Sequence, residues 1–583
     1  MRNLEGKFQQ ALSLHQQGQL PRAQALFEEI LSLQPKHAGA LTVLGLMAGQ
    51  TGNYARAAQL FGKAVAVDPG NAGAHNNRGL ALHELGQWEA ALKSFNQAAR
   101  IKPDYGLAYY NRAGTQIRLK QWEAALASYD RVLALDPRNA EAHSNRGNVL
   151  GELGRWEAAL ASYDQAIAIR PTYAEAHYNR GNALKAMQRW DAALESYDRA
   201  LAYSPGYVLA LFNKGVVLQD LKRWEAALEA YQQAIAAKPD YAEAYSNRGN
   251  IFRELTQWEA ALASYDQALA AKPDYAEAQT NRAIVRLLLG DFERGWQDYE
   301  CRWRHADTST LADIRTFSQP RWSGEESIAG KTILVHTEQG FGDVLQFCRY
   351  VQPVADLGAR VILEVPKPLL SLITSLDGVS QLVARGSELP QFEYQCPLLS
   401  LPLAFRTRLE TIPASARYIR ADEAKVADWR VKLGEKTKAR VGLAWSGSTT
   451  GKSIPLEQLI QRLPAGFQYV SLQKEVRDAD RDVLRSSRAI ADFAQELNDF
   501  SDTAALCECL DLVISVDTSV AHLGGALGKP TWIVLMYSAD WRWLLDRDDS
   551  PWYPAAKLYR QERIGEWAGA LARMAADLTR QPF

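Results

Sequence analysis

Cysteine is scarce in this chain, with five residues among 583, and positive charge is not in excess, with a formal net charge of -1. The cysteine count is odd and no C-x-x-C pair accompanies histidines, which argues against a disulfide framework and against a zinc site. The balanced charge argues against bulk attraction to nucleic acid or to an anionic membrane. We therefore expect neither a metal centre nor a nucleic-acid partner.

Long apolar runs are missing as well. No uninterrupted run approaches the roughly 20 residues needed to cross a bilayer. The first residues, MRNLEGKFQQ, lack the apolar core of a signal peptide. We expect a cytoplasmic protein without a transmembrane segment, and a chain of 583 residues should form several domains.

Tryptophan and proline instead recur with a period of 34 residues in the first half of the chain. A period held this strictly indicates one small unit copied many times, and such a unit must stack on its neighbours to bury a core. The repeated positions are Trp88, Trp122, Trp156, Trp190, Trp224 and Trp258, and Pro35, Pro69, Pro103, Pro137, Pro171, Pro205, Pro239 and Pro273.

One unit, 143–176, shows the pattern in full: Gly147, Ala159, Tyr163, Ala166 and Pro171 combine small residues, one aromatic residue and a terminal proline. Small residues let two antiparallel helices touch, and proline ends the second helix. The pattern resembles the tetratricopeptide repeat family in about eight units, and we assign residues 1–304 to this array. The resemblance implies a superhelix with the first helix of each unit on the concave face, and the tryptophans should begin the second helices.

An asparagine ladder follows the same period on the first helices. Amide side chains donate and accept, so a row of them can bind an extended peptide backbone of any sequence. The ladder is similar to that of O-linked N-acetylglucosamine transferases, in which it holds protein substrates; the alternative is that asparagine is merely common at this position of the family. The ladder residues are Asn77, Asn111, Asn145, Asn179, Asn213, Asn247 and Asn281.

A basic residue follows each ladder asparagine. The stripe would suit acidic partners, but we favour the alternative in which the stems pack between helices and the heads pair with nearby carboxylates. The positions are Arg78, Arg112, Arg146, Arg180, Lys214, Arg248 and Arg282. The array also offers a surface for a possible homo-oligomer.

The pattern decays after Gly290. The stretch GDFERGWQDYECRWR predicts a last helix that docks the array onto the second half of the chain, through Trp296, Tyr299 and Trp303. Residues 305–330 lack periodicity, and we interpret them as a connector.

Short apolar runs alternate with helical segments from Lys331 onward, a pattern typical of parallel sheets covered by helices. The predicted strands are 332–336, 360–365, 440–445, 469–473, 511–516 and 531–536. A charged helical stretch near 420–438 separates two α/β lobes, 331–430 and 431–583. Ligands of open α/β sheets bind beyond the carboxyl ends of the strands, so the loops there are the candidate site.

The first of these loops is TEQGFGD, which follows the strand at 332–336. Gly340 and Gly342 permit a tight turn, and Asp343 opens the next helix. Aspartate is also a common N-cap, which is the structural alternative. A cap needs neither two glycines nor the preceding Glu338, so we favour a role in a site.

The second loop is WSGSTTGKS, 445–453, in which glycines, hydroxyl residues and a lysine follow a strand. Such a loop suits phosphate, although the glycine and lysine spacing of a Walker loop is missing. The alternative is a solvated lysine. The candidate binding residues are Trp445, Ser446, Ser448, Thr449 and Lys452.

The third loop is SVDTSVAHLGGALGKP. The strand ends at Asp517, and Thr518 and Ser519 begin a helix whose free N–H groups can bind an anion. His522 lies one turn into this helix. A lone histidine is usually structural, but this one shares the helix end with the proposed site.

Taken in order, the three loops resemble glycosyltransferases of the GT-B fold, specifically the family 9 group typified by lipopolysaccharide heptosyltransferases. The resemblance covers roughly 331–583 and rests on Gly342-Asp343, the Lys452 loop and Asp517-Thr518-Ser519 with His522. It implies that Asp343 is the general base, that Lys452 assists the leaving phosphates and that the Asp-Thr-Ser segment holds a nucleotide diphosphate. No Asp-x-Asp metal motif follows a strand, which fits a fold that usually works without metal.

The segment DWRWLLDRDDSPWYP, 540–554, departs from simple heptosyltransferases. Its aromatic residues with Arg542 and Arg547 could clamp a sugar or base, close the lobe interface, or form a packed C-terminal cap. A repeat array joined to GT-B lobes resembles the layout of protein O-glycosyltransferases, although the donor motifs are not those of the N-acetylglucosamine enzymes.

The sequence therefore predicts a solenoid of tetratricopeptide repeats followed by a GT-B domain of two Rossmann-like lobes. We expect an inverting, metal-independent and cofactor-free glycosyltransferase that uses a nucleotide-sugar and modifies a hydroxyl, on a protein bound by the array. Two alternatives stay open. One is a non-catalytic scaffold with a degenerate transferase domain, and the other is an enzyme acting on lipid or polysaccharide whose repeats recruit partner proteins.

Overall fold

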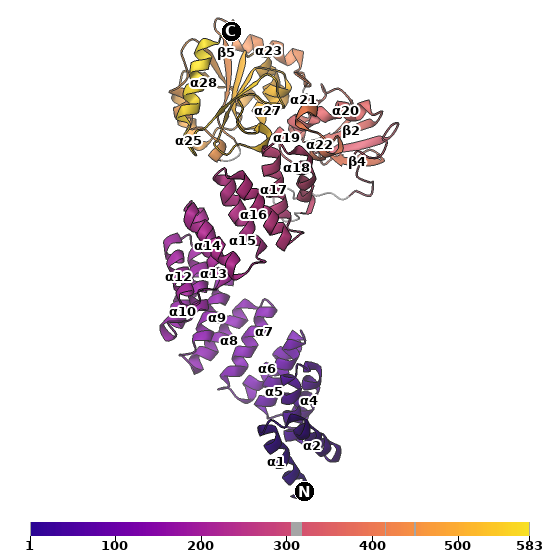
Figure 1. Cartoon of the computed structure of the whole chain (residues 1–583), viewed down its shortest axis with the longest axis vertical. Helices are drawn as coiled ribbons and strands as arrows, with labels where there is room; N and C mark the ends of the chain where they lie inside the picture. Colours follow the sequence, from indigo (N-terminus) through magenta and orange to yellow (C-terminus); the bar gives the residue numbers. More distant parts are fainter. Residues whose placement is uncertain (1, 305–316, 414, 448–449, 582–583) are drawn as a thin grey trace. The chain divides into compact units, whose positions relative to one another are not determined.

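The computed structural model describes residues 2–304, 317–413, 415–447 and 450–581. The chain forms two compact units, Met1–Pro239 and Asp240–Phe583 (Figure 1). The first contains helices only. The second begins with two further helix pairs and continues into an α/β region.

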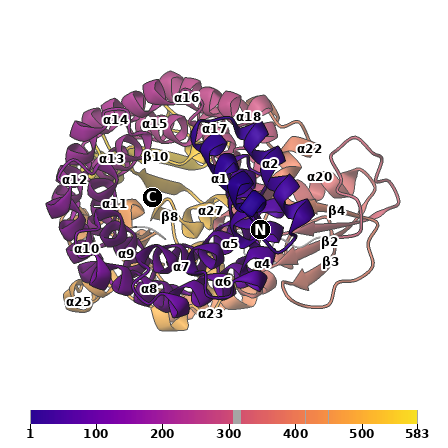
Figure 2. The same cartoon turned by 90° about the horizontal axis from the view of Figure 1, so that it is seen from below.

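Unit 1 consists of helix pairs in which each helix packs against its neighbours in sequence. Figure 2 shows that the first helices of successive pairs follow the inner side of a curve and the second helices its outer side. The helices are α1 (Arg2–Gln16), α2 (Leu20–Leu33), α3 (Ala38–Gln50), α4 (Tyr54–Val67), α5 (Ala72–Glu84), α6 (Trp88–Ile101), α7 (Gly106–Arg118), α8 (Trp122–Leu135), α9 (Ala140–Glu152), α10 (Trp156–Ile169), α11 (Ala174–Ala186), α12 (Trp190–Tyr203), α13 (Val208–Asp220) and α14 (Trp224–Ala237). From α6 onward each second helix begins at the repeated tryptophan, as predicted.

A glycine in the first helix of most pairs explains how closely the two helices approach. A Cβ at Gly147 would lie 2.5 Å from Cε1 of Tyr163, which is 4% exposed. The same contact recurs between Gly181 and Tyr197 at 2.5 Å. The aromatic ring thus occupies the space that a side chain would take, which is why the repeat keeps a small residue there.

Replacing Gly181 by alanine should therefore destabilise unit 1. The ring of Tyr197 is fully buried, so it can make room only by displacing its own neighbours, and we expect a loss of about 1–3 kcal/mol, typical of overpacking. At Gly114, on the equivalent helix α7, an added Cβ would meet no described atom within 4 Å. Gly114→Ala is the matched control and should stabilise the helix by up to about 1 kcal/mol. Urea unfolding followed by far-UV circular dichroism compares the two, and equal midpoints would contradict the packing argument.

Unit 2 opens with the end of the repeat array and continues into two parallel sheets. The repeat helices are α15 (Ala242–Glu254), α16 (Trp258–Ala271), α17 (Ala276–Leu288) and α18 (Phe292–Tyr299), followed by the short 3-10 helix η1 (Glu300–Arg304). The strands are β1 (Thr332–His336), β2 (Arg360–Val365), β3 (Val379–Ala384), β4 (Tyr394–Pro397), β5 (Arg440–Ala444), β6 (Gln468–Ser471), β7 (Ile490–Ala491), β8 (Leu512–Val516), β9 (Thr531–Leu535) and β10 (Ala556–Arg560).

The first sheet has the order β3-β2-β1-β4 and the second the order β10-β9-β8-β5-β6-β7. All their strand pairs are parallel. The six predicted strands are confirmed as β1, β2, β5, β6, β8 and β9, and the sequence did not predict β3, β4, β7 or β10. Two parallel sheets in succession, each with its own helices, confirm the predicted α/β class of the second half.

The helices of the α/β region connect these strands. They are α19 (Phe341–Phe347), α20 (Val351–Asp356), α21 (Leu370–Ile373), α22 (Leu401–Ala404), α23 (Glu423–Leu433), α24 (Leu456–Ile460), α25 (Asp478–Ser486), α26 (Phe500–Glu508), α27 (Ser519–Ala526) and α28 (Ala568–Arg580). Short 3-10 helices are η2 (Cys348–Tyr350), η3 (Lys367–Leu369), η4 (Leu398–Ser400), η5 (Leu409–Thr411), η6 (Thr450–Lys452), η7 (Ala494–Glu496) and η8 (Trp541–Trp543).

The last repeat shares one hydrophobic core with the α/β region. Trp296 of α18 is 2% exposed, and its indole N–H donates to the carbonyl of Thr407 at 3.2 Å. Its ring meets those of Phe347 and Trp541 edge to face, with centroids 6.4 and 5.3 Å away. The predicted docking helix is therefore confirmed. Of the predicted connector, 305–316 lie outside the described residues, and in the remainder Trp322 is buried.

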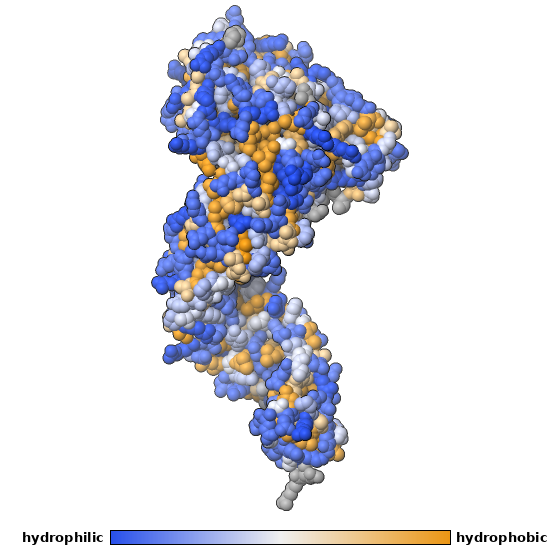
Figure 3. Space-filling view, viewed as in Figure 1, coloured by the Kyte–Doolittle hydropathy of each residue, from blue (hydrophilic) through white to orange (hydrophobic). Residues whose placement is uncertain are grey.

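Hydrophilic residues cover most of the face seen in Figure 3, with apolar residues distributed among them. Across the part of the chain that the structure describes, no helix is both long enough and apolar enough to cross a membrane.

Candidate functional site

A cavity of about 520 Å³ in unit 2 gathers loops from the carboxyl ends of several parallel strands. The loop after β1 supplies Gly340, Phe341, Gly342 and Asp343; Lys452 follows β5; Asp517, Thr518, Ser519 and His522 follow β8; Asp540, Trp541 and Arg542 follow β9. Ile284 of α17 and Tyr299 of α18 complete the wall from the repeat side, together with Gln339. Eight predicted site residues thus lie around one cavity, although they are distributed over about 180 positions of sequence.

Asp343 lies in the first turn of α19, and both of its carboxylate oxygens accept hydrogen bonds. One accepts the backbone N–H of Gly340 at 3.1 Å. The other accepts from the guanidinium of Arg542. The N-cap of α19 is Gly340 and Asp343 is its third residue, so the alternative of an N-cap aspartate was wrong. Burial raises the pKa of Asp343 above its ordinary value, although Arg542 acts in the opposite direction. Asp343 therefore supports the start of its helix from inside the first turn and also presents a carboxylate of raised pKa to the cavity.

Lys452 and Asp517 form an ion pair on the opposite wall, with Nζ 2.5 Å from Oδ2. The indole N–H of Trp543 donates to the other oxygen of Asp517 at 3.0 Å. Burial alone would lower the pKa of Lys452, but Asp517 and Asp540 outweigh it, so that the pKa lies above its ordinary value. Lys452 is thus a cation fixed beside the cavity by its ion pair with Asp517, and not a solvated side chain.

His522 is a buried, neutral member of the site. Its Nδ1 lies 2.8 Å from the hydroxyl of Tyr553, and its ring stacks on Trp543 with centroids 5.3 Å apart. Burial is the main cause that lowers the pKa of His522 to about 3. The imidazole is therefore uncharged at neutral pH and can act as a hydrogen-bond partner without adding charge.

Gly342 marks a point where α19 and α27 approach closely. A Cβ at Gly342 would lie 2.8 Å from Cδ2 of His522. Only glycine leaves room for this approach, which brings the loop that carries Asp343 to the start of α27. Thr518 is the N-cap of α27 and makes no side-chain capping bond, so the amide groups at this helix end remain available to an anion.

Arg542 is the most heavily engaged cation of the cavity. It is 8% exposed, pairs with Asp343 and binds Asp540 at 2.7 Å. Its guanidinium lies 4.3 Å from the ring centroid of Trp541. Burial alone would lower the pKa of Arg542, yet Asp540 and Asp343 raise it. Burial alone would raise the pKa of Asp540, yet Arg542 and Lys452 lower it.

The segment 540–554 combines two of the roles considered from the sequence. Trp541, Trp543, Trp552 and Tyr553 are at most 3% exposed and pack in the core, as in the packed-cap alternative. Arg542 instead faces the cavity. Arg547 pairs with Asp549 at 2.6 Å, so it is not part of a clamp in this structure.

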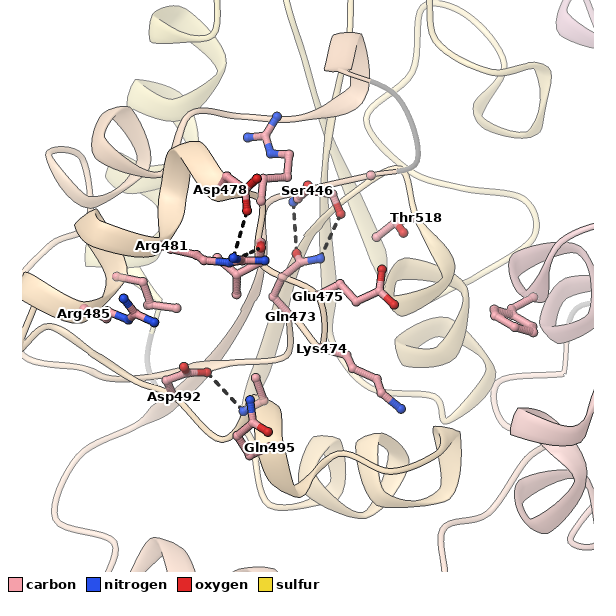
Figure 4. Close-up of a pocket in the computed structure, with 16 residues that line it drawn as sticks. Ser446, Gln473, Lys474, Glu475, Asp478, Arg481, Arg485, Asp492, Gln495 and Thr518 are labelled. Atoms are coloured by element: carbon pink, nitrogen blue, oxygen red, sulfur yellow. Dashed lines mark hydrogen bonds and ion pairs between the residues drawn. The ribbon is translucent and has the colours of Figure 1, made fainter.

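A second, larger cavity of about 1160 Å³ adjoins the first, and both are lined by Phe341 and Thr518. Ser446 lines it, and the side chain of Gln473 bridges the backbone N–H and C=O of Ser446 at 3.1 and 3.3 Å (Figure 4). Glu475 lies beside them without a partner among the described residues. The cavity therefore offers an exposed carboxylate next to the helix end at Thr518.

Three predicted binding residues lie elsewhere or cannot be placed. Trp445 is fully buried in the core of the second sheet and lines neither cavity, and its N–H donates to Asp480 at 3.3 Å. Ser448 and Thr449 lie outside the described residues. Glu338 does not line the smaller cavity either; it pairs with Arg302 of η1 at 2.9 Å.

The ladder asparagines are half-buried on the first helices of the pairs. Within unit 1, Asn145 donates to the hydroxyl of Tyr110 at 2.8 Å and Asn111 to the amide of Asn76 at 3.0 Å. Within unit 2, Asn281 donates to Asn250 at 3.0 Å. Each bond joins a ladder amide to the preceding repeat, and an amide has capacity for further bonds.

Four of the basic residues beside the ladder pair with carboxylates, as in the alternative that we favoured. Arg146, Arg180 and Lys214 each bind an aspartate sixteen residues upstream at 2.7 Å. Arg282 binds Asp298 at 2.7 Å and a second aspartate at 2.6 Å. Arg112 and Arg248 bind serine hydroxyls at 3.0 and 3.2 Å. These heads are engaged within the array, which weakens the interpretation as a stripe for acidic partners.

Comparison with known proteins identifies the repeats. A family model described as TPR repeat matches residues 117–154, 147–188 and 249–290. A second, described as Tetratricopeptide repeat, matches residues 8–61, 48–106 and 178–242. These ranges extend over most of the helical part of the chain.

Individual relatives share part of the chain. Protein FlbA of Caulobacter vibrioides is 27% identical over 335 residues, which cover 51% of this chain and 54% of FlbA. The chain thus spans about half the length of this curated relative. The crystal structure of MamA is 25% identical and covers 28% of this chain and 96% of MamA, with a TM-score of 0.27. That of YrrB, described as a TPR protein with an unusual peptide-binding site, is 24% identical and covers 32% of this chain and 96% of YrrB, with a TM-score of 0.28. The N-terminal region of this chain therefore consists of tetratricopeptide repeats.

Proposed function

We propose that the α/β region is a glycosyltransferase of the GT-B type that transfers a sugar from a nucleotide-sugar to a hydroxyl group. The observation that carries the proposal is the convergence of loops from both parallel sheets on one cavity. Asp343 comes from the first sheet, and Lys452 and Asp517 come from the second. Ligands of open α/β sheets bind where such loops meet.

The donor would occupy the two adjoining cavities. Its diphosphate would lie at the amino end of α27, near Lys452, where backbone amides and a cation favour negative charge. Its nucleoside would extend into the larger cavity beside Ser446 and Glu475. A carboxylate accepts hydrogen bonds from ribose hydroxyls, which gives Glu475 a role.

The reaction would be a single displacement with inversion. The acceptor oxygen forms a bond to the anomeric carbon while the bond from that carbon to the phosphate oxygen breaks, and the diphosphate leaves with the electron pair. Asp343 takes the proton of the acceptor hydroxyl, and its raised pKa suits it to this task. Lys452 and the amides of Thr518 and Ser519 stabilise the charge that develops on the diphosphate.

A polypeptide acceptor would use the repeats. The asparagines of the array can bind an extended backbone. In unit 2, Asn281 and Ile284 lie on the same helix, α17, and Ile284 lines the cavity. A protein acceptor should therefore need the array for turnover, whereas a lipid or glycan acceptor should not.

Calorimetric titration with nucleoside diphosphates and nucleotide-sugars tests the donor site. We expect the full-length protein to bind one base preferentially, and Lys452→Ala to weaken binding about 10–100-fold, the effect of losing a charge-assisted hydrogen bond. Lys436→Ala is the matched control, since Lys436 pairs with Asp511 at the protein surface. Glu475→Gln should weaken nucleotide binding and leave the binding of inorganic diphosphate unchanged.

The rival function is a repeat scaffold whose α/β region no longer catalyses a reaction. It is favoured by the matches to repeat families, which concern the helical part of the chain. Failure of the wild-type protein to bind any nucleotide of the panel would reject the transferase and leave the scaffold as the better explanation.

A further inference from the structure

Both cations in the described lining of the smaller cavity are engaged by carboxylates. Three carboxylates, those of Asp343, Asp517 and Asp540, line it with these two cations, Lys452 and Arg542. Lys452 pairs with Asp517, and Arg542 pairs with Asp343 and Asp540. His522 adds no charge at neutral pH because burial lowers its pKa to about 3. With the three carboxylates ionised and the two cations protonated, the described lining carries a net charge of -1.

A diphosphate would bring further negative charge into this space. At least one cation must then turn from a carboxylate toward the phosphate oxygens, because like charges close together repel, most strongly beside buried groups. Lys452 pairs with one carboxylate, that of Asp517, which is 9% exposed. If Lys452 left, the buried Asp517 would lose its cation and keep the hydrogen bond from Trp543. Arg542 has two partners, and its fork of donors can keep Asp540 while it exchanges the other.

We propose that Arg542 is a donor-binding residue that exchanges Asp343 for the donor diphosphate, and that this exchange releases Asp343 to act as the base. This inference rests on the proposed function and adds an order of events at the same site, in which donor binding precedes the release of Asp343. In the structure, Arg542 donates to one carboxylate oxygen of Asp343 and the N–H of Gly340 donates to the other. With the donor bound, the first oxygen becomes free to accept the acceptor proton.

The exchange would also strengthen the base. A cation beside a carboxylate lowers its pKa, and Arg542 is the foremost group acting in that direction on Asp343. When the guanidinium turns to phosphate, burial and the neighbouring Asp540 remain, and both raise the pKa of Asp343. A base that is strong only after the donor has entered would favour binding of the donor before the acceptor.

The exchange predicts opposite effects of two substitutions on binding, measured by calorimetry with the nucleoside diphosphate that binds the wild-type protein. Arg542→Gln should weaken binding about 10–100-fold. Asp343→Asn should tighten it about 3–10-fold, because Arg542 no longer has to leave a carboxylate. In the Arg542→Gln background the tightening by Asp343→Asn should vanish, since the two residues act through one contact.

Two further variants serve as controls. Arg542→Lys should recover part of the affinity that Arg542→Gln loses. Arg547→Gln should leave the affinity unchanged, because Arg547 pairs with Asp549.

Each result decides between the alternatives. Tightening by Asp343→Asn cannot arise from misfolding, so this variant keeps the test informative even if Arg542→Gln is unstable. Wild-type binding together with unchanged affinity in Asp343→Asn would overturn the exchange and leave the proposed function standing. Independent, additive effects of the two substitutions would overturn it as well. Absence of binding to the wild-type protein would overturn the proposed function and this inference together.

Discussion

Replacing Asp343 by asparagine should lower sugar transfer by about 10³-fold, within the range of general acid–base catalysis. Asparagine keeps the shape of the side chain and can still accept the Gly340 N–H, but it cannot take up the acceptor proton. The donor should still bind, because Lys452, Thr518 and Ser519 are unchanged. The measurement is transfer of labelled sugar to acid-precipitable protein, with the donor identified by calorimetry.

The control for this substitution is Asp377→Asn. Asp377 belongs to the same lobe, and its exposed side chain pairs with Arg420. It should keep wild-type turnover. The wild-type rate should also fall on the acid side, at a pH above that expected for an ordinary aspartate, since burial raises the pKa of Asp343 and the protonated acid is no base. Turnover retained by Asp343→Asn would exclude Asp343 as the base.

Replacing Trp296 by alanine should destabilise unit 2 by about 3–5 kcal/mol, the usual cost of truncating a buried tryptophan. The side chain is 2% exposed and lies between the repeat helix α18 and the α/β region. Its loss opens a cavity beside Phe347 and Trp541, and it also leaves the Thr407 carbonyl without its donor. Urea unfolding of the full chain and hydrogen exchange across α18 should both report the loss.

The matched control is Trp190→Ala in unit 1. Trp190 begins α12 and is half-buried, so the same truncation removes fewer contacts there. Its effect should be clearly smaller and confined to unit 1. If both substitutions shifted the unfolding midpoint equally, Trp296 would not hold the last repeat to the α/β region.

Periodicity made the repeats predictable almost to the residue, because most helix pairs repeat the same contact between a small residue and an aromatic ring. The central strands were predictable for a similar reason: β1, β5, β8 and β9 are buried almost throughout and appear as continuous apolar runs. The strands that the sequence did not reveal are short or at sheet edges. β3 mixes exposed and buried residues, and β7 has two residues, so neither stands out from a loop.

The candidate site was predictable where its loops follow buried strands. Asp343, Lys452 and Asp517 follow β1, β5 and β8, and the structure brings all three to one cavity. Asp540 was not named as a site residue, although the segment 540–554 that begins with it was considered as a clamp, because its aromatic and arginine residues drew the interpretation. Tyr299 could not be found in this way, since it comes from a repeat helix that reaches the cavity only through tertiary packing.

Trp445 illustrates a different limit. It directly follows β5, as a ligand-binding residue would, yet its large apolar ring is fully buried in the core of the second sheet. The polar face of the loop begins one residue later, at Ser446. Position at a strand end therefore indicates that a loop lies near the site. The hydrophobicity of each loop residue then decides whether it packs in the core, as Trp445 does, or faces the cavity, as Ser446 does.

The contact between Gly181 and Tyr197 also bears on how such a chain can change over generations. Both residues belong to one 34-residue repeat, so duplication or deletion of a whole repeat duplicates or removes the complete contact. Each helix packs mainly on its sequence neighbours. In such arrays each repeat therefore packs on the next through a similar surface. Recombination between repeats can therefore alter the length of the array without compensating substitutions. Selection can then adjust the length of the array separately from the candidate site in the α/β region.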